Sequence, residues 1–156
     1  RLRADLLEVD VETSNHRSGH PFPIGPFDLN EVWQEVEVRD GRGELVMHVG
    51  KLGEDLRVDP EAHQLGAEEL DRDGVPITHH RIWDIAAVVE REQIPQGGSV
   101  SHRYEVPVPE GASGPFEVQV AWNYRRVNQD FADWVYGVNG KTFPVHRIAS
   151  ASTEIP

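Results

Sequence analysis

The chain contains no cysteine among its 156 residues. This absence excludes disulfide bonds, thiolate catalysis and zinc sites built from cysteine. It also excludes covalent haem attachment within the chain, because that attachment uses a Cys-x-x-Cys-His motif. The lack of cysteine does not fix the compartment in which the protein works.

Long apolar runs are missing as well. No segment approaches eighteen consecutive apolar residues, so the sequence predicts no membrane-spanning helix. No signal peptide is recognisable, and the chain opens at Arg1 without an initiator methionine. The simplest interpretation is a processed protein or a piece of a longer one.

Positive charge is scarce relative to negative charge, with 15 Lys and Arg against 27 Asp and Glu, a formal net charge of −12. An acidic surface repels phosphate backbones, so we expect no nucleic-acid partner. The acidity itself is explained by solubility, although it would also suit a basic partner. With only 38% hydrophobic residues, we expect long polar loops or a face covered by a partner.

Alternation of apolar and polar residues dominates the chain, and this period of two is typical of strands with one buried face. Leu7, Val9 and Val11 alternate with acidic residues, and Asp40-Gly41 marks a hairpin turn. Further candidate strands lie at 32–38, 45–49, 65–70, 76–83, 100–108, 116–124 and 143–148, whereas 85–89 fits either a strand or a helical turn.

These short strands, separated by turns at roughly ten-residue spacing, predict an all-β, immunoglobulin-like antiparallel sandwich. One short helix is expected near the C-terminus, capped by Asn128, with Phe131, Trp134 and Val135 on one face. We expect a single domain at residues 1–149 and a disordered tail at 150–156.

The cleanest alternation runs from Phe116 to Tyr124. It predicts a central strand with Val118, Val120 and Trp122 pointing inward. A buried charge at Val120 would then cost several kcal/mol of stability.

The segment from Asn15 to Gly25 is unusual because two glycines and two prolines surround His20. Proline fixes one backbone angle and glycine adopts angles that other residues avoid, so this loop is rigid. A rigid loop can aim an imidazole at a metal or a haem iron. On spacing alone, a proline-rich crossover with an incidental histidine is the simpler explanation.

The pattern Asn-x-x-x-Gly-His-x-Phe-Pro-x-Gly at residues 15–25 resembles the start of a C-terminal β-domain found in many multihaem c-type cytochromes. Three later segments are similar to that family in the same order. They are Asp28-Leu29-x-Glu31-Val32-Trp33 with its hairpin, Ile94-Pro95-x-Gly97-Gly98-Ser99, and Tyr124-Arg125-Arg126-x-Asn128-x-x-Phe131. The resemblance covers residues 7 to 147.

In that family the β-domain packs on a haem-bearing region, and its Gly-His loop presents a distal ligand. The resemblance therefore implies His20 as the axial ligand of a haem c held on another chain or segment, with His16 on the same loop as the alternative ligand. It also implies a haem-free accessory role in electron transfer, a haem-bearing partner, and a periplasmic or extracellular location in a bacterium.

The remaining candidate sites are weaker. His79-His80 is predicted on a strand with its rings on opposite faces, and His48, His63, His102 and His146 are predicted as isolated surface residues. Asp55, Asp59 and Glu61 offer oxygens to Ca²⁺, but the spacing lacks the Asp-x-Asp-x-Asp-Gly loop. No catalytic motif is present, so the chain is not expected to be an enzyme by itself.

Two alternatives stay open at this point. One is a protein- or glycan-binding module without a redox role, with Trp33, Trp83 and Trp134 on its surface, although these residues fit packing in the core or between domains better. The other is a mononuclear metal enzyme that uses His16, His20 and either His79 or His80.

Overall fold

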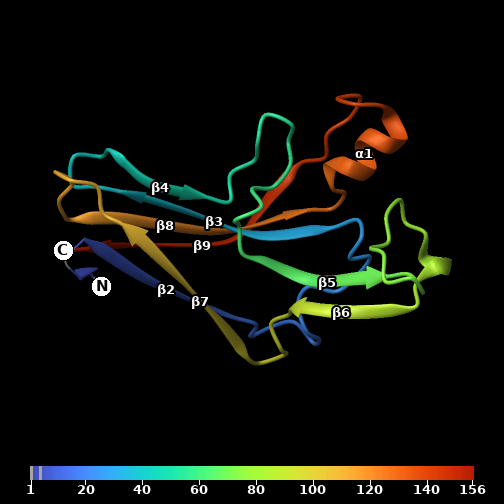
Figure 1. Cartoon of the computed structure of the whole chain (residues 1–156). Helices are drawn as coiled ribbons and strands as arrows, with labels where there is room; N and C mark the ends of the chain where they lie inside the picture. The colour runs from blue at the N-terminus through green and yellow to red at the C-terminus, as the bar shows by residue number, and fades with distance from the viewer. Residues whose placement is uncertain (1, 4) are drawn as a thin grey trace.

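A computed structural model describes residues 2–3 and 5–156 of the chain, so Arg1, the expected start of the domain, lies outside the described residues. The fold is an antiparallel sandwich of two sheets with one short helix (Figure 1). This confirms the predicted all-β class. Among the described residues, no helix is long and apolar enough to cross a membrane.

The smaller sheet has the strand order β1-β2-β7. Its strands are β1 (Leu2–Arg3), β2 (Leu6–Ser14) and β7 (Ser99–Pro107). The larger sheet has the order β6-β5-β3-β8-β9, and β4 pairs with β3 beside this path. Its strands are β3 (Glu31–Arg39), β4 (Leu45–Val49), β5 (Gln64–Leu70), β6 (Ala87–Glu92), β8 (Phe116–Arg125) and β9 (Val145–Ile155).

The main core lies between the two sheets and follows from the alternation in the sequence. Inward-facing apolar residues of β2 and β7 meet those of β3 and β8, and they form one cluster of buried side chains: Leu7, Val9, Val36, Val38, Tyr104, Val106, Phe116 and Val118. A second cluster, at the end of the sandwich that carries the 15–25 loop, contains Val32, Leu65, Ile94 and Trp122. The indole nitrogen of Trp122 donates to Thr13 Oγ1 at 2.8 Å, which ties β8 to β2.

Helix α1 (Gln129–Tyr136) begins at the predicted position, because the Asn128 side chain accepts a hydrogen bond from the backbone N–H of Phe131. Its buried residues are Gln129 and Ala132, whereas Trp134 and Val135 are exposed. The aromatic face of the helix therefore points away from the core.

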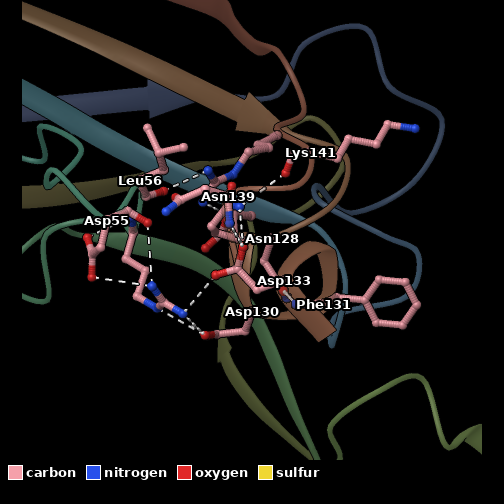
Figure 2. A network of polar contacts seen from close by, with 12 residues as sticks. Asp55, Leu56, Asn128, Asp130, Phe131, Asp133, Asn139 and Lys141 are labelled. Atoms are coloured by element: carbon pink, nitrogen blue, oxygen red, sulfur yellow. Dashed lines mark hydrogen bonds and ion pairs between the residues drawn. The ribbon is translucent and has the colours of Figure 1, made fainter. Parts of the chain in front are cut away.

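Polar contacts fasten α1 to the rest of the domain, and Figure 2 shows them around Asp130 and Asp133. The Arg57 guanidinium, from the loop after β4, reaches Asp130 at 2.6 Å and Asp133 at 3.4 Å. Asp133 also accepts from the Gln129 side chain and from the backbone of Asn139. These contacts, led by the Gln129 hydrogen bond, hold the pKa of the Asp133 carboxyl below its usual range.

Two predictions of local structure are wrong. Residues 150–155 of the expected disordered tail at 150–156 instead belong to β9, which pairs with β8 because the backbone of this segment completes the sheet. Residues 76–83 were expected to form a strand, but His79 and His80 both adopt positive φ angles, of 59° and 56°, which break an extended chain. A 3₁₀ turn at Ile82–Asp84 follows, and residues 87–92 form the next strand.

The prediction for β8 is confirmed in its essentials. The strand is central, between β3 and β9, and Val118 and Trp122 are buried. Val120 also packs against the core, but only in part, because it borders a groove that opens between β2 and β9.

This difference gives a test of the packing. Val118→Asp should lower the free energy of unfolding by several kcal/mol, because it buries a charge without a partner. Val120→Asp should cost clearly less, since its carboxylate can reach the groove. Urea unfolding of the two variants measures this, and equal losses would contradict the described burial of Val120.

Candidate functional site

The loop at residues 15–25 is fastened to the turn at residues 94–98. Asn15 and residues 97–98 exchange two backbone hydrogen bonds: Asn15 N donates to Gly98 O at 2.9 Å, and Gly97 N donates to Asn15 O at 2.8 Å. Phe22 and Ile94 exchange a second backbone pair at 2.9 and 2.7 Å. Both arms of the loop are thus bound to one short segment, which makes the loop part of the folded body.

The buried side chain of Asn15 organises the interior of this loop. Its amide nitrogen donates to the backbone oxygens of His20, at 2.9 Å, and Ile94, at 3.2 Å. Its oxygen accepts from the backbone N–H of Ser18 at 3.2 Å. One side chain therefore satisfies three backbone groups and holds His20 in place.

The His20 ring is exposed, and both of its polar contacts involve Nδ1. Nδ1 lies 2.7 Å from the Pro21 carbonyl oxygen and 3.1 Å from Ser18 Oγ. Because a carbonyl can only accept, this contact favours the tautomer with hydrogen on Nδ1. The lone pair of the neutral ring then lies on Nε2, which has no partner in the part of the chain that the structure describes.

That arrangement matches what a metal-ligating imidazole needs. Histidine ligands commonly donate their second ring N–H to a backbone carbonyl or carboxylate, which fixes the tautomer and the ring orientation. His20 has this second partner within its own loop. Chemically, the loop can offer one oriented neutral nitrogen to an iron or another metal ion that approaches from outside.

His16, the alternative ligand, is also exposed, but no ring contact or shared hydrogen bond joins it to His20 within the described residues. The two histidines proposed as further ligands of a mononuclear site are engaged elsewhere. His80 Nδ1 lies 3.1 Å from the buried Asp28 carboxylate, and the His79 ring stacks on Trp134 at 4.3 Å. Nowhere in the described ranges do three His, Asp or Glu side chains form a group suited to a metal ion.

Asp55 and Asp59, which were considered as Ca²⁺ ligands, form hydrogen bonds to nearby backbone groups. Asp55 accepts from the backbone of Arg57 and pairs with its guanidinium at 3.4 Å. Asp59 accepts from the backbone N–H groups of Gly50 and Glu61. The carboxylates therefore stabilise turns, and no contact in this part of the structure brings them to a common point.

The other segments that resemble the cytochrome β-domain make contacts that stabilise the fold. Asn128 donates from its backbone to Leu29 O and from its side chain to Asp28 O, both at 2.7 Å. The buried Arg125 guanidinium pairs with Glu31 at 2.5 Å. Segments that lie about a hundred residues apart in the sequence thus meet in pairs, and their polar groups are occupied by structure.

Two of the histidines predicted as isolated are in fact stacked, which corrects that prediction. His63 and His102 lie with ring centroids 4.1 Å apart, and His63 Nε2 contacts Glu92 at 2.6 Å. Neighbouring rings of Trp122 and Tyr104 complete the cluster. The sequence did not predict this contact, because alternation identifies strands but does not show which segments lie side by side.

Burial, together with the neighbouring His63, holds the pKa of His102 below its ordinary value, although Glu92 opposes the shift. The folded state therefore binds fewer protons at His102 than the unfolded state does. As pH falls below about 6.5, the unfolded state gains protons first and stability declines. This decline ends once the pH passes below the pKa of His102 in the folded state.

Among the tryptophans, Trp33 is buried, and its indole donates to Gly50 O at 2.8 Å, as expected for a core residue. Trp83 and Trp134, in contrast, are 76% and 58% exposed. Ile82, Val135 and Tyr136 next to them are exposed as well. These side chains leave apolar surface open on the 3₁₀ turn and on α1.

Comparison with solved structures places this fold beside that of a haem protein. The chain matches a crystal structure of a penta-heme cytochrome c552 from Thermochromatium tepidum, with a TM-score of 0.72 and 15% sequence identity. The match covers 99% of this chain but only 37% of that one. No family model matches the sequence, and no curated protein matches it.

The hydrogen bonds that the Asn15 side chain makes to the loop and to Ile94 can be tested by substitution. Asn15→Ala should cost about 1–3 kcal/mol of unfolding free energy, since it removes three hydrogen bonds that hold the loop together and join it to Ile94. Ser18→Ala, in the same loop but partly exposed, should change stability by less than about 0.5 kcal/mol. If thermal and urea unfolding gave Asn15→Ala the stability of the wild type, the Asn15 side chain would not organise the loop.

The histidine stack predicts a pH dependence. Wild-type stability should fall between pH 7.5 and 5.5, and His102→Phe should flatten this slope while keeping an aromatic ring in the stack. Urea midpoints at both pH values measure the effect. His146→Phe, at an exposed position on β9, is the matched control and should leave the slope unchanged.

Proposed function

We propose that this domain is a haem-free accessory part of a multihaem c-type cytochrome. It covers a haem-bearing chain or segment, and His20 donates an axial ligand to one of the haems held there. The observation that carries the proposal is the His20 ring itself, exposed and tethered through Nδ1 with Nε2 free.

The contrast between His20 and the other matched residues supports a functional role. Asn15, Arg125 and Asn128 make hydrogen bonds or ion pairs that hold loops and strands together. His20 is exposed, and its ring makes no contact beyond its own loop. A structural role therefore accounts for the former residues but leaves the imidazole unexplained.

Haem is the metal group that fits best. A loop that offers one nitrogen cannot hold a free ion, because zinc and calcium sites need several protein ligands. A haem iron already has four porphyrin nitrogens and a proximal ligand, so a single histidine completes its coordination. Since the chain has no cysteine, the haem c would be attached to another chain or segment.

The fold likeness and the exposed apolar side chains fit the same proposal. A chain of a penta-haem cytochrome shares this fold over about a third of its length. Trp83 and Trp134 would pack against the haem-bearing region and exclude water from the haem. Burial, the axial ligand and the surrounding hydrogen bonds together set the reduction potential of a haem. Haem c proteins of this kind would place the domain in the periplasm or outside the cell.

Substitution of His20 in the assembled cytochrome tests the ligand. His20→Ala should leave the β-domain folded, because the ring is exposed, and should convert one haem from six-coordinate low-spin to five-coordinate or water-ligated. Electron paramagnetic resonance and resonance Raman spectra report this change. Any histidine–iron bond should measure about 2 Å in a structure of the assembly.

Two controls make the result decisive. His16→Ala, on the same loop, should leave the haem spectra unchanged, and so should His146→Ala on β9. Loss of a low-spin haem in His16→Ala alone would transfer the ligand role to His16. Unchanged spectra in both loop variants would overturn axial ligation by this loop.

A further inference from the structure

β9 is an edge strand of the larger sheet. The strand spans Val145–Ile155, and within the described residues it pairs only with β8. Its residues are exposed up to Glu154. In Figure 1 it runs along β8, at the end of the strand order, with β2 beyond it.

Edge strands usually carry devices that block further pairing, such as short length, proline or charge. The other edges of this sheet have them: β4 has five residues, and β6 carries Arg91 and Glu92 in its six. β9 has eleven residues and no proline, and the stretch from Ile148 to Thr153 is uncharged. A bulge at Ile148 is a device of this kind near the start of β9, but residues 149–155 after it pair with β8 in regular register.

The β9 edge is also not sealed by the smaller sheet. Grooves of about 220 and 230 Å³ lie between β2 and β9, lined by Val11 of β2, by Ala151 of β9 and by Val120 of β8, which pairs with Ala151. A further strand can therefore approach the β9 backbone.

Charge is distributed unevenly along the outer face of β9. Near its start, Arg147 is 60% exposed and lies 3.7 Å from Glu35. Near its end, Glu154 lies directly opposite Glu117 of β8. Like charges that face each other across strands are destabilising, so the far end of β9 lacks a cation.

A second copy of this chain would supply that cation. When two β9 strands pair in antiparallel fashion about a two-fold axis at Ala151, Ser150 of each faces Ser152 of the other, on the same face of the sheet. The bulge at Ile148 then brings Arg147 of one copy opposite Glu154 of the other. The two-fold axis produces this contact twice.

We propose that β9 is a self-pairing edge, through which two copies of this chain form a dimer with one sheet continuous across both molecules. Backbone hydrogen bonds supply affinity, and the two Arg147–Glu154 contacts fix the direction and register of the pairing. The small side chains from Ala149 to Ala151 allow the two backbones to approach. This inference is independent of His20 and of the proposed haem partner.

Charge reversal tests the pairing on the 156-residue chain. In sedimentation equilibrium at about 0.15 M salt, where distant charges are screened, the wild type should dimerise. Arg147→Glu and Glu154→Arg should each weaken association at least tenfold, because each places two like-charged contacts in the symmetric dimer. Circular dichroism should show that both variants stay folded, since both side chains are exposed.

Restoration distinguishes this register from a general charge effect. The double variant R147E/E154R should dimerise like the wild type, and an equimolar mixture of the two single variants should form heterodimers. Arg72→Glu and Asp73→Arg, at exposed positions in the turn after β5, make the same changes in net charge and should leave association unchanged, because β3 and β8 separate β5 from β9. A monomeric wild type, a dimer indifferent to Arg147→Glu, or a double variant that fails to recover would each overturn the proposal.

Discussion

The buried amide of Asn15 is the contact on which the architecture of the candidate site depends. It lies where the chain leaves β2, and it reaches across to a segment 79 residues later in the sequence. By satisfying backbone groups of the loop and of Ile94 together, it joins the two halves of the chain at one end of the sandwich. The position of the His20 ring is thus set by the tertiary fold and not by the loop alone.

Alternation in the sequence was sufficient to find most strands, because a period of two is forced on any strand with one buried face. It located β2, β3, β7 and β8, and Asn128 marked the start of α1. It failed where backbone geometry overrides side-chain pattern. Residues 76–83 resemble a strand in composition, yet two successive histidines adopt left-handed angles that no pattern of hydrophobicity reveals.

The start of β9 was predicted as the strand at 143–148, but the rest of the strand was missed for the opposite reason. Its residues after Ile148 are small and polar, so hydrophobicity marks them as a tail, whereas the sheet needs only their backbone to continue. The candidate site was likewise predicted only in part. Composition singled out the rigid loop around His20, but the Nδ1 contacts and the clamp to residues 94–98 depend on long-range pairing. The stacking of His63 on His102 also depends on contacts between segments that are distant in the sequence.

The pairing of β3 with β8 has a consequence for biosynthesis. Glu35 and Asn123, which meet across these neighbouring strands, are 88 residues apart. Contacts of such high sequence separation form slowly, because a long loop must close before they stabilise anything. During translation the first hundred residues therefore leave the ribosome without their central partner strand. The loop that carries His20 cannot close on residues 94–98 until that turn has emerged as well, so unpaired strand edges stay exposed over this interval.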